Sequence, residues 1–236
     1  GANTTLFSTG ALTSAASFRA ALSGGTCPMD YSNVIDITVS PAAVAGTAAL
    51  NDATSGLTVC SGGSKAFKVT NNIGNIQWQS SSTSSTSGFN DIPDAVASID
   101  TVENIISTKW YRAKISRNEC IAYTNSIQIT VNQPTLSGYI SGNDSICSGQ
   151  LSSLSLNSSS GIVAWQRSTN WTAVSPTWTT VLTGPITFST GSINTSVAYR
   201  ARLTSGVCPV STSEVFVVYV SPTAASGTIN SAASVC

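Results

Sequence analysis

One short stretch occurs three times in this chain and constrains its fold more than any other feature. Each copy opens with an aromatic residue, an Arg and an Ala, and closes with a Cys nine residues after the aromatic. The third copy reads Ala198-Tyr-Arg-Ala-Arg-Leu-Thr-Ser-Gly-Val-Cys-Pro209, and the others span residues 17–28 and 110–121. Self-similarity at a fixed period, here about 90 residues, is the signature of tandem repeats. We therefore predict an array of similar domains.

The segments that follow each copy set the expected domain boundaries. Residues 34–39 and 126–131 alternate as half-buried strands do, and a Pro soon interrupts each run. We predict the C-terminal part of a first repeat over 1–41, a second repeat over 42–134, a third over 135–222 and the start of a fourth over 223–236. An alternative cut just after the first Cys of each repeat gives 1–60, 61–147 and 148–236. Because the first repeat begins in mid-unit, we expect a piece of a longer protein.

The pattern within each repeat predicts an all-β fold. About seven short strands alternate with turn residues, and no stretch has a convincing helical period, which is typical of an Ig-like Greek-key β-sandwich. The third strand carries a Trp that we expect between the two sheets, and the aromatic of the repeated stretch falls on the sixth strand. The predicted core anchors are Trp78, Trp165, Phe18, Tyr111 and Tyr199.

The composition argues against several classes of function. Only 8% of the residues are charged, ten basic and ten acidic, so nothing marks a nucleic-acid or anionic-lipid surface. The chain has no His, which removes the commonest general base and metal ligand. We predict no enzyme activity, no cofactor and no metal site. No apolar run is long enough for a transmembrane helix, so we expect no membrane insertion.

The repeated motifs also resemble a known group of proteins. Val-Cys-Ser-Gly, Ile-x-Trp-Gln-Ser, Tyr-Arg-Ala, Ser-Gly-x-Cys and Val-Ser-Pro recur in register, although the second copy has Arg117-Asn-Glu in place of the Ser-Gly turn. This pattern is similar to the tandem Ig-like or PKD-like repeats of giant Bacteroidota surface adhesins. These include the SprB-type gliding-motility adhesins exported by type IX secretion. The resemblance implies a filamentous or stalk-like protein on the outer cell surface.

Six Cys without a Cys-x-x-Cys motif indicate disulfides and an oxidising compartment. Pairing within a repeat would join Cys60 to Cys120 and Cys147 to Cys208. However, the two cysteines of one sandwich fall at opposite ends of strands that span roughly 23 Å, whereas bonded Cα atoms lie within about 7 Å. We therefore favour sequential pairing across a hairpin at each Pro, with the last strand of a domain supplied by the next repeat. Those pairs are Cys27–Cys60, Cys120–Cys147 and Cys208–Cys236.

Three weaker patterns could mark binding or modification sites, but each also fits ordinary surface residues. Asp91, Asp94, Asp100 and Glu103 are of the type that binds calcium, but their spacing matches no loop motif and favours a solvated loop. Trp171 and Trp178 are candidates for stacking on sugar rings, although sandwich cores and edges also use Trp. Thr101 and Ser145 follow an Asp and precede an apolar residue, a pattern that resembles Bacteroidota O-glycosylation sites.

Two functional hypotheses follow from these patterns. The first is a structural and adhesive segment of a large repetitive cell-surface adhesin or filament, involved in surface attachment or gliding motility. The alternative is a glycan-binding or spacer array of a secreted polysaccharide-degrading protein. The expected partners are neighbouring repeats of the same chain, surface glycans and other cell-surface proteins. The expected location is extracellular, on the outer cell surface.

Overall fold

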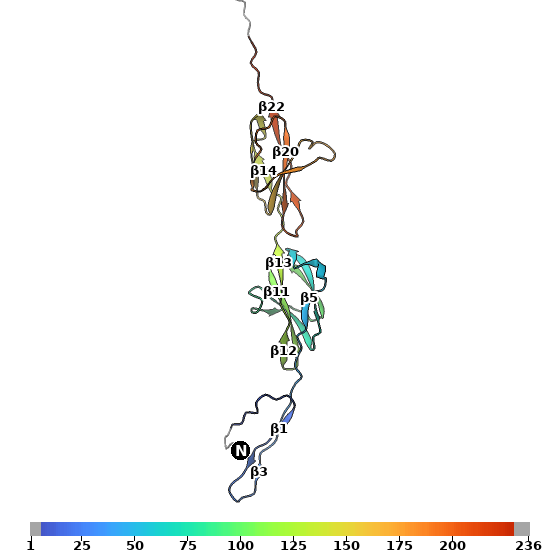
Figure 1. The fold of residues 1–236 in the computed structure, drawn as a ribbon, viewed down its shortest axis with the longest axis vertical. Coiled ribbons are helices and arrows are strands. Elements are labelled where there is room, and N and C mark those ends of the chain that lie inside the picture. Colours follow the sequence, from blue (N-terminus) through green and yellow to red (C-terminus); the bar gives the residue numbers. More distant parts are fainter. Residues whose placement is uncertain (1–5, 229–236) are drawn as a thin grey trace, which may run out of the picture. The chain divides into compact units, whose positions relative to one another are not determined.

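The computed structural model describes residues 6–228, which are all-β apart from one 3-10 turn, η1 (Ala53–Ser55) (Figure 1). The chain divides into two compact units. One comprises Gly1–Thr54, Ala66–Thr101 and Lys109–Gln128, and the other comprises Ser55–Lys65, Val102–Thr108 and Ile129–Cys236. Within residues 6–228, no helix has the length and apolarity needed to cross a membrane. The predicted all-β class is confirmed.

Residues 6–41 form two small two-stranded sheets. Strands β1 (Ala16–Phe18) and β4 (Ile35–Ile37) pair antiparallel, as do β2 (Ala21–Leu22) and β3 (Asp30–Tyr31). Phe18 is half-buried and its ring centroid lies 6.2 Å from that of Phe7. The prediction that Phe18 is a core anchor is therefore wrong, because none of the described residues 6–41 is buried and they form no core.

Residues 42–134 form two sheets. Their strand bounds are β5 (Thr47–Leu50), β6 (Thr58–Cys60), β7 (Gly63–Thr70), β8 (Asn75–Ser81), β9 (Asn90–Asp91), β10 (Ile99–Ile105), β11 (Lys109–Arg117), β12 (Cys120–Tyr123) and β13 (Ile127–Asn132). One sheet has the order β10-β7-β5 and the other β6-β13-β11-β8-β9, with β12 paired to β11.

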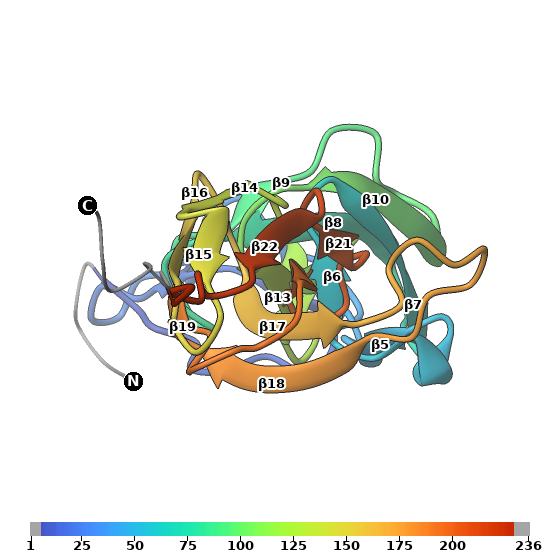
Figure 2. The same ribbon diagram turned by 90° about the horizontal axis from the view of Figure 1, so that it is seen from above.

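Residues 135–222 repeat this arrangement. Their strands are β14 (Tyr139–Gly142), β15 (Ser145–Cys147), β16 (Ser153–Asn157), β17 (Ile162–Ser168), β18 (Thr179–Gly184), β19 (Thr187–Ser189), β20 (Val197–Thr204), β21 (Ser211–Thr212) and β22 (Phe216–Ser221). The sheet orders are β14-β16-β19 and β15-β22-β20-β17-β18, with β21 paired to β20. Strand β18 lies beside β17 and ends the larger sheet (Figure 2).

The strand connections define an Ig-like sandwich in both repeats. The first strand joins the smaller sheet, and the chain then crosses to the larger one. There β6 pairs parallel to β13, and β15 pairs parallel to β22. Each larger sheet thus joins strands that are distant in sequence, as the Greek-key order of Ig-like domains requires. The predicted tandem of Ig-like sandwiches is confirmed.

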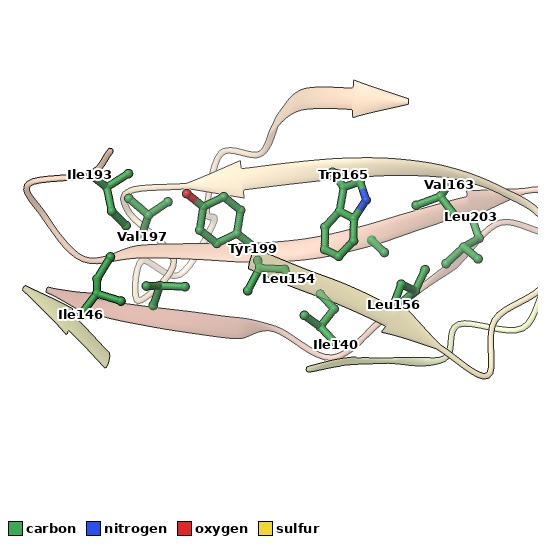
Figure 3. Packing of buried hydrophobic residues seen from close by; sticks show 12 residues of the cluster. Ile140, Ile146, Leu154, Leu156, Val163, Trp165, Ile193, Val197, Tyr199 and Leu203 are labelled. Carbon is green, nitrogen blue, oxygen red and sulfur yellow. The ribbon is translucent and has the colours of Figure 1, made fainter. Parts of the chain in front are cut away.

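In each larger sheet a Trp, on β8 or β17, lies in the core. Trp165 is 0% exposed and Trp78 is 1% exposed, and Tyr199 on β20 and Tyr111 on β11 are also buried. Each indole N–H donates to a backbone carbonyl at 3.0 Å, from Trp165 to Pro185 and from Trp78 to Ala97. Figure 3 shows Trp165 and Tyr199 facing Leu154 and Ile140 of the opposite sheet. The core therefore buries apolar surface without leaving the indole donor unpaired.

Replacing a buried Leu of this core should be costly. Leu154 is 0% exposed, so we expect Leu154→Ala to lower the free energy of unfolding by about 3 kcal/mol through lost burial and a residual cavity. Leu151→Ala is the matched control, because Leu151 is 54% exposed and should change stability by less than about 0.5 kcal/mol. Urea unfolding followed by Trp fluorescence measures both; equal losses would contradict the assigned core.

Candidate functional site: a disulfide that joins two repeats

Strand pairing places Cys60 at the C-terminal end of β13. Cys60 ends β6 and lies opposite Asn132 in the parallel register of β6 with β13. The next N–H, from Ser61, donates to the Asn132 carbonyl at 2.9 Å. Gly62 then turns the chain with a φ of 87°, a conformation that favours glycine. Cys60 is half-buried, and its position follows from backbone pairing rather than from packing of its own side chain.

A tight turn places Cys208. The repeated stretch ends β20 at Thr204, and the Cys208 N–H then donates to the Ser205 carbonyl at 2.9 Å. Gly206, inside this turn, has a φ of 49°. Cys208 is 6% exposed. Its burial shows that the turn packs against other parts of the chain rather than projecting into solvent.

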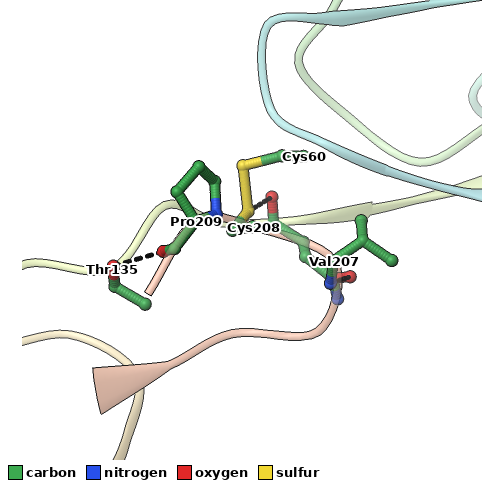
Figure 4. Close-up of a disulfide and its surroundings, with 6 residues drawn as sticks. Cys60, Thr135, Val207, Cys208 and Pro209 are labelled. Atoms are coloured by element: carbon green, nitrogen blue, oxygen red, sulfur yellow. Dashed lines mark hydrogen bonds between the residues drawn. A yellow bond between two sulfur atoms is a disulfide. The ribbon is translucent and has the colours of Figure 1, made fainter. Parts of the chain in front are cut away.

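The two cysteines are joined by a disulfide (Figure 4). Their Cα atoms are 4.9 Å apart, within the normal range for such bonds. The bond links residues 148 positions apart, in different sequence repeats, and both lie in the second compact unit. In the chain-entropy account, closing a loop of this length is worth about 5 kcal/mol against the unfolded chain.

Asn132 connects the two sides of the bond. Its side-chain oxygen accepts the Val207 N–H at 3.2 Å, and its carbonyl oxygen lies 3.4 Å from the Cys208 sulfur. A Cβ on Gly206 would collide with the Asn132 side-chain amide, so Gly206 permits this close approach. Thr135 adds a hydrogen bond from its hydroxyl to the Pro209 carbonyl at 2.9 Å. The turn that carries Cys208 therefore packs closely against the end of β13 and the residues that follow it.

The preferred sequential disulfides are wrong. Cys60 pairs with Cys208 and not with Cys27, and Cys27, Cys120 and Cys147 are free thiols. The expected hairpin at Pro134 does not form, because β12 (Cys120–Tyr123) pairs with β11, and β15, which ends at Cys147, pairs with β22 of its own repeat. The pairing within repeats that we disfavoured is not observed either. Cys236 lies outside the described residues.

The Arg of the repeated stretch is enclosed by aromatic rings in the second repeat. The guanidinium carbon of Arg112 lies 3.9 Å from the ring centroids of both Phe89 and Tyr123. Its Nε–H donates to Gln79 Oε1 at 2.9 Å, and the Gln79 amide donates to Asp91 at 2.6 Å. Lys114 completes the chain with a 2.9 Å salt bridge to Asp91. Charge, ring faces and hydrogen bonds are thus combined on one sheet surface.

The third repeat uses the same design with one ring. Arg200 lies 4.2 Å from the centroid of Trp178 and donates to Gln166 at 2.9 Å. Arg19 in the first repeat lies 3.9 Å from the Tyr31 ring. One ring face of Trp178, a candidate for glycan contact, is therefore occupied by Arg200 of the same repeat. Trp171 is half-buried in the loop between β17 and β18.

The shifted pKa values are those of structural groups. Hydrogen bonds from Gln79 and then Lys114 keep the pKa of Asp91 below its ordinary value of 3.8. Burial raises the pKa of Tyr111 and Tyr199 above 10.0. Burial, followed by the nearby Arg202 charge, lowers the pKa of Arg200. These shifts move the pKa values of Asp91, Tyr111 and Tyr199 further from pH 7, whereas a general acid or base works best with a pKa near the operating pH.

The other predicted candidates are surface residues. Thr101 is exposed on β10, and Ser145 is exposed at the start of β15. Asp91 is engaged with Lys114, and Asp94 adopts a left-handed turn with a φ of 60°. In the described part of the chain, no three acidic or Cys side chains gather as metal ligands would.

The sequence reasoning missed the residues that make the junction. Asn132 and Thr135 contact the turn that contains Gly206, but that turn is more than 70 residues away in sequence, and all three are common residue types. One available signal was the turn Gly two residues before Cys27 and Cys208. Another was the placement of the two cysteines of a repeat at opposite strand ends, which leaves the adjoining repeat as the nearest source of a partner.

These features define the class of protein: tandem Ig-like sandwiches with a covalent bond between successive repeats. A family model described as "Domain of unknown function (DUF8696)" matches residues 45–133 and 136–222. The chain belongs to this family. None of the curated proteins searched matches it.

Two solved structures are similar to this chain. A chain in the crystal structure of a mouse coronavirus receptor-binding domain complexed with its murine receptor is similar at 11% identity, with a TM-score of 0.51. That match covers 73% of this chain and 99% of that one. The A168-A170 domains of titin are similar at 14% identity, with a TM-score of 0.40, over 87% of this chain and 74% of theirs.

The close approach at Gly206 gives a direct test of the junction. We expect Gly206→Ala to shift the Cys60–Cys208 equilibrium toward the dithiol by about tenfold in a glutathione buffer, because the new Cβ meets Asn132 at a positive φ. Gly191→Ala is the matched control, since Gly191 has a similar φ of 65° and open space around it. Mass spectrometry of alkylated thiols gives the ratio; equal shifts in both variants would contradict the role of Gly206.

The stacked Arg should stabilise the second repeat. We expect Arg112→Ala to lower the free energy of unfolding by about 2–3 kcal/mol, the sum of two ring contacts and a hydrogen bond. Arg112→Lys should recover only part, because an ammonium group lacks the planar face that stacks on both rings. Arg117→Ala on the same strand is the control. Urea unfolding measures all three; full recovery by Lys would refute the stacking contribution.

Proposed function

We propose that this chain is a load-bearing structural and adhesive segment of a large repetitive cell-surface protein. The observation that carries the proposal is the Cys60–Cys208 bond, which crosses from one repeat into the next. A disulfide inside a single domain stabilises that domain alone. A disulfide between repeats makes the array itself resistant to extension, which is a property that a stalk or filament needs.

The bond reroutes tension applied to the two ends of the chain. Force that enters along the N-terminal segment reaches Cys60, crosses the sulfur atoms to Cys208 and leaves along the C-terminal segment. Residues 61–207 lie inside the closed loop and carry none of that tension. Both tryptophan cores, at Trp78 and Trp165, are inside this loop. While the bond is intact, the strands inside this loop are shielded from the applied tension, whereas β5, β21 and β22 lie outside the loop and bear it.

Composition and motif resemblance support the cell-surface part of the proposal. A disulfide persists in oxidising surroundings such as the cell exterior. The charged fraction of 8% leaves a surface of mostly Ser, Thr, Asn and Gly, which limits nonspecific electrostatic binding. The resemblance to SprB-type adhesin repeats favours attachment or gliding on the outer surface of a bacterium of the Bacteroidota. In this role the chain transmits force and makes contacts, and it performs no catalysis.

Single-molecule stretching between the chain termini tests the load-bearing role. Reduction should lengthen the fully extended chain by roughly 500 Å, because it releases a loop of 148 residues at about 3.5 Å each. The oxidised chain should extend only by the residues outside the loop, and the length of residues 61–207 should not be released.

A double variant, Cys60→Ser with Cys208→Ser, provides the matched control. It should reach the reduced length with or without reductant, because it has no bond to break. Equal contour lengths for the oxidised and reduced wild-type chains would refute the load-bearing role.

A further inference from the structure

Cys147 is a free thiol in the position that Cys60 occupies one repeat earlier. Cys147 lies opposite Ser221 in the parallel register of β15 with β22, as Cys60 lies opposite Asn132 in β6 with β13. The following N–H groups make the same bond, since Ser148 donates to Ser221 at 2.9 Å. The next glycine turns in the same way, with a φ of 85° at Gly149. Cys147 is exposed, so within the described residues no cysteine lies beside it as Cys208 lies beside Cys60.

Cys120 is a free thiol in the position that Cys208 occupies one repeat later. Its sulfur lies 4.0 Å from the Ser40 carbonyl, and the Cys208 sulfur lies 3.4 Å from the Asn132 carbonyl. Ser40 and Asn132 are equivalent, since each follows the Val that ends the strand-like run of its repeat. Cys120 therefore already contacts the end of the preceding repeat as Cys208 does.

The turn before each closing cysteine has one backbone conformation. The residue two places before the Cys has a φ of 58° at Gly25, 51° at Asn118 and 49° at Gly206. Asn is among the few residues other than Gly that adopt this region readily. The departure of Arg117-Asn-Glu from the Ser-Gly pattern thus preserves the turn that presents the cysteine.

We propose that the Cys60–Cys208 bond is one of a continuous series along the polypeptide. Cys147 pairs with the closing cysteine of the following repeat. Cys120 pairs with the cysteine that takes the place of Cys60 in the preceding repeat. The partner in each case is a thiol on another Ig-like repeat of the same chain. Each repeat then gives one cysteine to the repeat before it and one to the repeat after it.

The chemistry is ordinary thiol–disulfide exchange with a small disulfide oxidant such as oxidised glutathione. One cysteine thiolate attacks the oxidant, forms a mixed disulfide and releases one glutathione thiol. The partner thiolate then attacks the protein sulfur and releases the second glutathione. Two protein thiols are oxidised by two electrons to one disulfide, and one glutathione disulfide is reduced to two thiols.

The proposed bonds interlock. Position 147 lies inside the loop closed by Cys60 and Cys208, so the loop that begins at Cys147 overlaps it. In such a series, every repeat has a disulfide that carries tension around part of its chain. Tension can then pass along the segment 120–147 from one bond to the next. This step goes beyond the load-bearing role of one bond, because it makes the shielding continuous.

A tandem duplication within the full chain tests the Cys147 pairing. Residues 135–222 are inserted again after residue 222, and the Cys147 of the second copy is replaced by Ser. After oxidation in glutathione buffer and alkylation, non-reducing peptide mass spectrometry should show Cys147 joined to the Cys208 peptide and protected from alkylation as fully as Cys60. The Cys60–Cys208 bond in the same molecules reports correct folding.

Several outcomes would overturn the proposal. They are alkylated Cys147 beside an intact Cys60–Cys208 bond, a Cys147–Cys236 bond, and a covalent dimer formed through Cys147. The matched control has Cys147→Ser in both copies, and it should leave the Cys208 of the second copy fully alkylated. Because this readout is bond identity rather than extension under force, the pairing can fail while the load-bearing role stands, and the reverse also holds.

A second duplication tests Cys120. Residues 42–134 are inserted again after residue 134, with Cys120→Ser in the first copy and Cys60→Ser in the second. The remaining Cys60 should then pair with Cys120 of the adjoining copy. A bond from Cys60 to Cys208, which is now two repeats away, would contradict the series.

Discussion

Strand direction is the constraint on which the junction depends. In the third repeat, β15 runs parallel to β22, and β20 runs antiparallel to β22. Cys147, at the end of β15, and Cys208, after β20, are therefore at opposite ends of one sandwich. Neither can reach the other while the sheets are intact. Any disulfide made by such a cysteine must leave its own domain, and the tandem order makes the adjoining repeat the nearest source of a partner. Asn132, Gly206 and Thr135 then supply the local fit that lets the two chain segments approach.

The repeated stretch combines three structural roles in ten residues. Its aromatic residue, Tyr199 in the third repeat, is buried between the sheets. The next residue, Arg200, points to the opposite face of the same sheet, where it stacks on Trp178 and bonds Gln166. This alternation follows from the period of two in a strand. The closing turn then presents the cysteine. A single strand and turn thus link the core, the sheet surface and the junction, which explains why these residue types recur together at one period.

The fold was largely predictable, and two local features were not. Alternating segments, a Trp on the third strand and turn residues at short spacing are local signals, and they locate the sheets and the tandem order. Phe18 has the same local signal as Tyr199, yet it is only half-buried, because none of the described residues 6–41 is buried and no core forms around it there. The run of Ser and Thr after β8 has no local signal for an ordered loop, yet the buried hydroxyl of Ser81 accepts the Thr83 N–H at 3.1 Å and donates to the Ser87 carbonyl at 2.6 Å, which organises that loop.

The sequence by itself determined the period, the Ig-like class, the identity of the core tryptophans and the presence of cysteines at two positions of each repeat. All of these depend on residue type and spacing within some 90 residues of chain. Only the tertiary structure decided which cysteines meet. The pair Cys60 and Cys208 is separated by 148 residues, and no local preference encodes a contact at that range. Its formation depends on where two completed sandwiches present their ends, and that position exists only after the strands have paired and the cores have packed.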